Sequence, residues 1–168
     1  DGVTTRLGEN HYIMTTTTGG AATVMGKLED FLQTEWPELN VYLTSVTDHF
    51  ATISVCGPHS KKILEKVTQN IDYSDTNFPH MSFKNGLIDK INCRVMRISF
   101  TGELSYEINV QANYGQSVWE KCMIAGKEYG ITPYGTEAMH LLRAEKGFVI
   151  VGQETDGTVT PVDLQMDW

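Results

Sequence analysis

The sequence lacks an excess of positive charge. Its 168 residues carry 13 lysines and arginines against 21 aspartates and glutamates, which gives a formal net charge of -8 at pH 7. Proteins that bind nucleic acids use cations to neutralise phosphates, so the charge balance argues against nucleic acid as a partner. A large anionic ligand is also disfavoured, although a few local arginines can outweigh a global average.

Long apolar runs and paired cysteines are also missing. No stretch approaches the roughly 20 apolar residues that a membrane-spanning helix needs, and no signal-peptide pattern is present. We therefore expect no membrane partner. The three cysteines, Cys56, Cys93 and Cys122, are odd in number and widely separated. This fits reduced thiols in a cytoplasmic protein better than a disulfide framework or a zinc site, and the five histidines lack metal-ligand spacing, so no metal is expected.

The composition of the sequence indicates a globular protein. Hydrophobic residues make up 40% and charged residues 20% of the sequence, as in soluble globular proteins. There is no internal repeat and no linker, so we expect a single domain over residues 1–168. The chain starts on Asp1 without a methionine and ends on Trp168, and we expect both ends to be cut from a longer protein.

The hydrophobic periodicity changes several times along the chain between the two-residue repeat of strands and the helical repeat. Hairpins are predicted over 3–18, 39–57 (around Thr47-Asp48) and 91–110 (with Thr101-Gly102 at the turn). Helices are predicted from Ala21 to before Pro37, over 60–69, 114–129 and 136–146, irregular structure over 70–90, and a short buried strand over 148–152. Hairpins mixed with helices predict an α+β fold with mainly antiparallel sheets and packed helices.

The stretch "SFTGELSYEINV", residues 99–110, leaves the role of one residue open. Side chains alternate along a strand, so Tyr106 and Ile108 share one face while Glu107 and Asn109 share the other. One interpretation is a solvated polar face. The other is a carboxylate that binds a ligand with adjacent N–H donors in a bidentate manner.

Three stretches carry a resemblance to a known family: "DGVTTRLGENHYIMTTTTGGAA", "RISFTGELSYEINV" and "GITPYGTEAMHLLRAEKGFVIVGQETDGTVTPVDL". They resemble the C-terminal part of the alpha subunits of heterotetrameric sarcosine oxidases. That part is similar to the glycine-cleavage T-protein (aminomethyltransferase) and to dimethylglycine oxidase. The resemblance covers nearly the whole chain and implies a fragment of an aminomethyltransferase-like folate-binding domain, truncated on its N-terminal side.

The resemblance implies tetrahydrofolate chemistry. The complete oxidases use FAD, FMN and NAD, which the family binds outside this region, and demethylate sarcosine to glycine and hydrogen peroxide. The folate domain captures the one-carbon unit as 5,10-methylenetetrahydrofolate. The expected partners are folate and the other oxidase subunits. Two alternatives stay open: aminomethyl transfer as in glycine cleavage, and a non-catalytic structural fragment.

The resemblance also implies site residues. The family motif Tyr-Thr-Gly-Glu-x-x-x-Glu, whose last glutamate holds the pterin ring, here runs from Phe100 to Glu107. Phe100 replaces the tyrosine and keeps the ability to stack but not to hydrogen-bond. Asp1 matches the second aspartate of an Asp-Asp motif, with the expected catalytic role of orienting the folate amine and stabilising positive charge during iminium capture.

Three further positions are implied to lie near folate. Thr17 falls near the family's ligand-contacting asparagine, and Trp168 aligns with a tryptophan that packs near the ligand or marks the domain end. The ligand-contacting arginine of the family is replaced within Met139-His140, a pair that favours the oxidase over the transferase. Arg143 is then either a folate-binding residue or a structural one that pairs with a carboxylate near the sheet.

Overall fold

The computed structural model describes residues 2–166 as an α+β fold with antiparallel sheets, which confirms the predicted fold class. Strands β1 (Gly2–Gly8) and β2 (His11–Thr16) form one two-stranded sheet. A four-stranded sheet has the order β3-β6-β5-β4. Its strands are β3 (Phe50–Cys56), β4 (Phe83–Ile88), β5 (Ile91–Met96) and β6 (Ser105–Gln111).

Residues 2–166 contain four α-helices: α1 (Ala21–Thr34), α2 (Ser60–Val67), α3 (Gly115–Gly126) and α4 (Thr136–Glu145). Helices α1 and α2 each connect two strands, whereas α3 and α4 follow β6. Short 3-10 turns occupy Thr18–Gly20, Thr47–His49, Ala112–Tyr114 and Lys127–Tyr129. No helix within residues 2–166 has the length and apolar character needed to cross a membrane.

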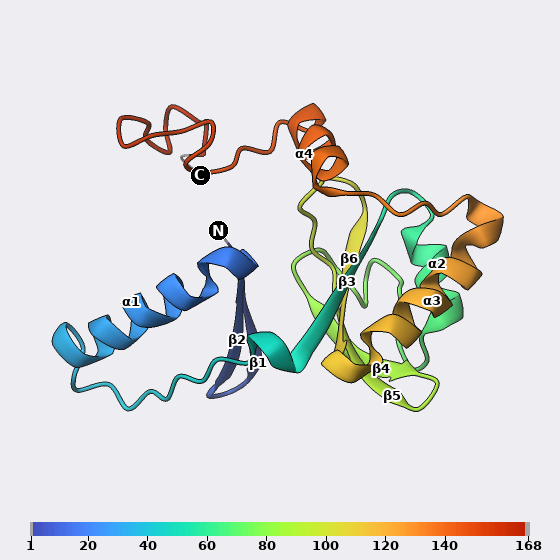
Figure 1. Cartoon of the computed structure of the whole chain (residues 1–168), viewed down its shortest axis with the longest axis horizontal. Helices are drawn as coiled ribbons and strands as arrows, with labels where there is room; N and C mark the ends of the chain where they lie inside the picture. Colours follow the sequence, from blue (N-terminus) through green and yellow to red (C-terminus); the bar gives the residue numbers. More distant parts are fainter. Residues whose placement is uncertain (1, 167–168) are drawn as a thin grey trace.

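The hydrophobic core lies between the four-stranded sheet and the α2–α3 pair (Figure 1). Tyr106, Ile108 and Val110 of β6 point into it and are at most 1% exposed. The ring of Tyr106 packs edge-on against Tyr73, with centroids 5.4 Å apart. Alternation along β6 therefore sends its apolar residues toward the helices and leaves Glu107 on the opposite face.

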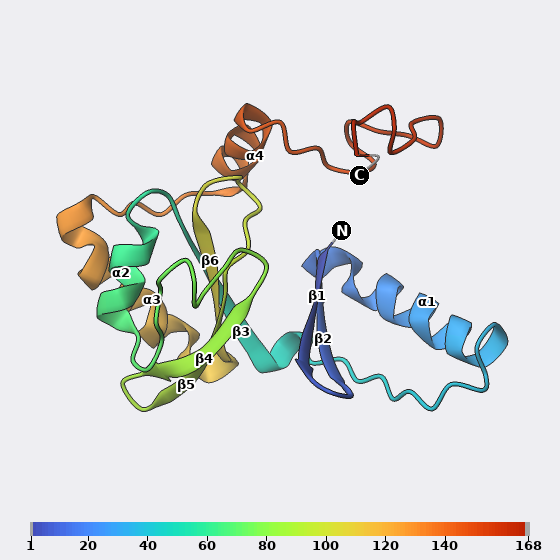
Figure 2. The ribbon, with the colours of Figure 1, turned by 180° about the vertical axis from the view of Figure 1, so that it is seen from behind.

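The β1–β2 hairpin stands beside that opposite face, and α1 extends away from it (Figures 1 and 2). Thr5 of β1 touches Met96 of β5, with its Oγ1 3.5 Å from the Met96 Sδ. No residue of α1 is buried. The hairpin and α1, residues 2–34, are therefore called the arm, because they lie outside the main core.

The predicted hairpin over 39–57 is wrong. Residues 39–46 form no strand, Tyr42 is 89% exposed, and β3 pairs with β6 along its whole length. A β-branched run has strand propensity, but the partner that β3 takes comes from 49 to 61 residues later in the chain.

Two other expectations are also wrong. Part of the segment 70–90 forms β4, which reaches β5 through a tight turn where Asp89 has a φ of 53°. The polar Lys84-Asn85-Gly86 run hides this strand in the sequence. Residues 148–152 form no strand, and Val151 is 73% exposed. The apolar run there has no neighbouring strand to pair with.

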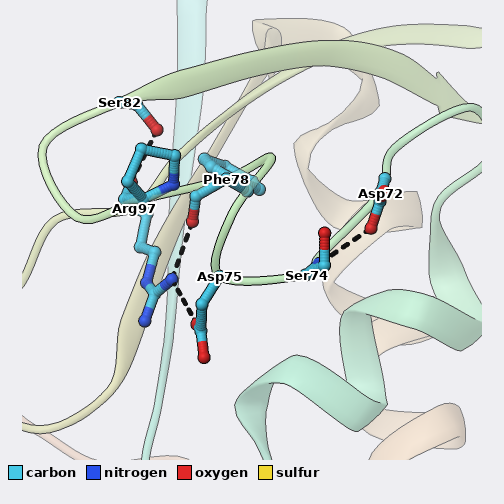
Figure 3. A network of polar contacts seen from close by, with 7 residues as sticks. Asp72, Ser74, Asp75, Phe78, Ser82 and Arg97 are labelled. Carbon is cyan, nitrogen blue, oxygen red and sulfur yellow. Dashed lines mark hydrogen bonds and ion pairs between the residues drawn. The ribbon is translucent and has the colours of Figure 1, made fainter.

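The predicted pairing of residues 91–110 is confirmed, with a longer connection than a tight turn. Arg97 fixes the start of this connection, since its Nη1 donates to the Asp75 Oδ1 and to the Phe78 carbonyl, each at 2.7 Å (Figure 3). Its backbone N–H also donates to the Ser82 carbonyl. The loop that carries Phe100 therefore leaves the sheet from a fixed point.

The thiols within residues 2–166 are unpaired, as predicted. Cys93 and Cys122 are buried, and burial raises the pKa of each to about 11. Cys56 is half-buried.

Candidate functional site

Glu107 lies in the middle of β6 on the side of the sheet that faces away from α2 and α3. Its cross-strand neighbours are Ser54 of β3 and Met96 of β5. We call this side the polar face and define it by these six residues: Thr52, Ser54, Arg94, Met96, Glu107 and Asn109. The β1–β2 hairpin approaches the polar face where Thr5 contacts Met96.

The carboxylate of Glu107 is half-buried and has no hydrogen-bond or ion-pair partner among residues 2–166. Burial raises its pKa above the usual glutamate value. A carboxylate withdrawn from water without a compensating donor is costly. Glu107 therefore differs from a fully solvated strand residue. Its carboxylate is suited to accept hydrogen bonds from a bound ligand.

Tyr134 is a further residue near the polar face, which it approaches at Ser54, and the sequence did not single it out. It comes from the segment between α3 and α4. Burial raises the pKa of its hydroxyl group, and smaller contributions come from Cys56 and from the charge of Glu107. The only signal in the sequence is its place in "TPYGTE", within a stretch that carries the family resemblance.

Phe100 and Arg143 meet at a different place, a pocket of about 110 Å³ near α4. Its lining consists of Ser99, Phe100, Arg143, Phe148, Val149 and Ile150. The Phe100 ring stands edge-on to His140 of α4, with centroids 6.0 Å apart. The pocket thus joins the loop before β6 to the segment that follows α4.

Arg143 is engaged in contacts within the chain. It is 5% exposed, its Nη2 lies 2.7 Å from the Glu154 Oε1, and its Nη1 donates to the Phe148 carbonyl at 3.0 Å. The hydrogen bond from Arg143 is the main reason why the pKa of Glu154 falls to about 2. These contacts match the structural alternative, in which Arg143 pairs with a carboxylate, although Glu154 belongs to the tail and not to the sheet.

Of the remaining predicted site residues, Thr17 lies within the described part of the chain. Thr17 is exposed at the end of β2, where its carbonyl accepts the Gly20 N–H. Asp1 and Trp168 lie outside the described residues. Within residues 2–166, no group of three or more histidine, cysteine or acidic side chains is placed to hold a metal ion.

Comparisons with known proteins agree with this fold. The family model described as "GCVT N-terminal domain" matches residues 1–168. The chain is 55% identical over its whole length to the sarcosine oxidase subunit alpha of Corynebacterium sp. (strain U-96), and covers 18% of that protein. For the same subunit of Rhizobium meliloti (strain 1021), the identity is 45% over 98% of the chain and 17% of the relative.

Similarity extends to transferases at lower identity. The chain is 36% identical to an aminomethyltransferase of Thermoanaerobacter sp. (strain X514), over 76% of the chain and 34% of that protein. The chain spans less than a fifth of the length of the sarcosine oxidase subunits that it matches. Because the family model covers all of its residues, the chain belongs to the GCVT N-terminal domain family.

Proposed function

We propose that the chain is the folate-binding part of a sarcosine oxidase alpha subunit, in which Glu107 holds the pterin ring of tetrahydrofolate. The observation that carries the proposal is the half-buried Glu107 carboxylate, which has no partner among residues 2–166. The identity of 55% to a sarcosine oxidase subunit, against 36% to an aminomethyltransferase, favours the oxidase over the transferase.

The donor set fits the ligand chemically. A pterin presents a 2-amino group and the neighbouring N3–H on one edge, and an ionised carboxylate accepts both in a bidentate manner. A strand in the middle of a sheet holds such a carboxylate more rigidly than a loop does. The hydroxyl group of Tyr134 is influenced by Ser54 of the polar face and by the charge of Glu107, so Tyr134 is a candidate to add an aromatic surface to this side of the site.

In the proposed reaction, sarcosine, O₂ and tetrahydrofolate give glycine, hydrogen peroxide and 5,10-methylenetetrahydrofolate. The oxidation belongs to FAD, FMN and NAD held elsewhere in the complex, together with the other subunits, in the cytoplasm. This chain binds and orients the folate. Asp1 has the proposed role of orienting the folate amine. Separate assays of peroxide and of methylenetetrahydrofolate in the Asp1→Ala variant test this role.

Calorimetric titration of the complete protein with folinic acid, a stable tetrahydrofolate analogue, tests the binding role of Glu107. Glu107→Gln replaces one acceptor oxygen by a donor and removes the charge. Loss of a charge-assisted contact costs about 1.5 kcal/mol or more, so affinity should fall at least tenfold. Glu65→Gln, an exposed change on α2, is the matched control and should bind as the wild type does. Equal affinity of wild type and Glu107→Gln would refute the proposal.

A further inference from the structure

The polar face carries unpaired donors two residues from Glu107. Asn109 is only 4% exposed, and its amide Nδ2 has no hydrogen-bond partner among residues 2–166. Arg94 is directly opposite Asn109 in the β5–β6 ladder, and its buried Nε and Nη1 also lack a partner in the described part of the chain. Buried donors without acceptors are rare in native proteins because each costs its full desolvation energy.

The orientation of the Asn109 amide is fixed from one side. Its Oδ1 lies 3.5 Å from the Oγ1 of Thr52 on β3, which makes the oxygen the acceptor. The Nδ2 atom is therefore the free end of the amide. Arg94 reaches over Phe83 of β4, with its guanidinium carbon 5.9 Å from the ring centroid, and burial lowers its pKa. Among residues 2–166, no acceptor is within hydrogen-bond reach of the Asn109 Nδ2 or of the Nε and Nη1 of Arg94, although the Glu107 carboxylate lies on the same face.

Glu107 and Asn109 share this face at the spacing of next-but-one residues on a strand, about 6–7 Å. The face thus presents an acceptor-only carboxylate and, beside it, a pair of donors. A ligand that satisfies both needs adjacent N–H donors followed directly by an acceptor on the same edge. A 2-amino-4-oxo pyrimidine ring, the edge of a pterin, has its amino and N3–H donors next to the 4-oxo acceptor.

We propose that Asn109 and Arg94 form a donor subsite beside Glu107 that binds the 4-oxo group of the pterin and selects 4-oxo over 4-amino folates. The inference rests on the proposed function, because it concerns the same ligand at the same face. Asn109 is the closer partner, since it lies on the same strand as Glu107. Arg94 adds positive charge opposite it, which strengthens a bond to an acceptor and repels a protonated 4-aminopyrimidine.

Folic acid and aminopterin test this selection, because aminopterin has an amino group in place of the 4-oxo oxygen and therefore also lacks the N3–H donor. The wild-type preference thus includes Glu107, and the change of that preference in variants of Asn109 and Arg94 isolates the donor subsite. We expect the wild-type complete protein to bind folic acid more tightly than aminopterin in calorimetric titrations. Asn109→Leu and Arg94→Met should each reduce that preference by about fivefold to tenfold. Asn109→Asp, which places an acceptor where a donor stood, should reverse it. Asn92→Leu, an exposed asparagine of β5, is the matched control.

The outcomes separate this inference from the proposed function. If the wild type binds neither compound, the folate proposal itself fails. If it binds both and the ratio stays the same in Asn109→Leu, Arg94→Met and Asn109→Asp, the donor subsite is wrong and the buried donors hold water instead. Thermal unfolding of each variant shows that it is folded, and a ratio of two affinities is insensitive to a small inactive fraction.

Discussion

At the scale of single residues, Glu107 shows that an alternating strand pattern predicts the face on which a side chain lies but not how deeply it is buried. The alternation predicted that Glu107 lies on the other face of the strand from Tyr106 and Ile108, and the structure confirms this. The pattern alone left a solvated carboxylate as one interpretation. The cross-strand neighbours of Glu107, Ser54 and Met96, come from other strands, so no local pattern around residue 107 reveals its half-burial.

The burial of Glu107 predicts how the stability of the chain depends on pH. Its pKa in the folded chain is raised above the usual value of 4.5, so the native state holds a proton that the unfolded state releases. Stability therefore falls as the pH rises from about 4.5 through the folded-state pKa. Glu107→Gln removes this loss. In urea unfolding of the chain, the variant should gain on the wild type between pH 4 and pH 7.

Glu137→Gln serves as the control, because Glu137 is exposed on α4. It should shift with pH in the same way as the wild type. A wild type that gains stability relative to Glu107→Gln over this pH range would mean that Glu107 is stabilised by a partner when ionised. That result would also remove the reason to expect a ligand at this carboxylate.

At the scale of elements, local periodicity predicts strands whose partner is next in sequence. The β1–β2 hairpin and the β5–β6 pair follow from alternation around turn residues. The β3–β6 pairing does not, because it joins segments about 55 residues apart. The run over 39–46 has strand propensity without a partner, and propensity does not create one.

The segment after α4 depends on one ion pair. Arg143 ties Glu154 and the Phe148 carbonyl to the helix, and the Glu154 carboxylate also accepts the Ile150 N–H at 2.7 Å. Arg143→Met keeps the length of the side chain and removes these bonds. Amide hydrogen exchange at residues 148–154 should become several-fold faster, while α2 and β6 keep their protection.

Acid should loosen the same segment in the wild type. The pKa of Glu154 is lowered to about 2, so the stabilisation is complete above about 4.5 and is lost as the pH falls toward 2. Lys27→Met, on exposed α1, is the control for a lost charge. Unchanged exchange at residues 148–154 in Arg143→Met would show that the apolar lining of the nearby pocket holds the segment instead.

At the scale of the whole molecule, the described chain has a packed part and an arm. The four strands β3, β4, β5 and β6 and the helices α2 and α3 enclose the buried side chains, whereas α1 has no buried residue. The sequence did not reveal this division, because α1 has the same helical periodicity of apolar residues as a core helix. Periodicity reports which face of a helix is apolar and not whether another element covers that face.

The division predicts unequal effects of equal truncations. Ile108 is fully buried in β6, so Ile108→Ala should lower the free energy of unfolding by about 2–5 kcal/mol. Leu28 of α1 is only half-buried, and Leu28→Ala should cost roughly 1 kcal/mol or less, because part of its surface stays in water and no residue of α1 is buried. Both changes remove the same number of carbon atoms.

Urea unfolding followed by circular dichroism measures the two free energies, and hydrogen exchange locates the effect. Leu28→Ala should speed exchange within residues 2–34 and leave β6 unchanged, because the arm contributes little to the main core. If the two variants lost equal stability in one cooperative transition, the arm would belong to the same folding unit as the sheet. The arm would then stabilise the polar face as well as lie beside it, and the burial of Glu107 would depend on both.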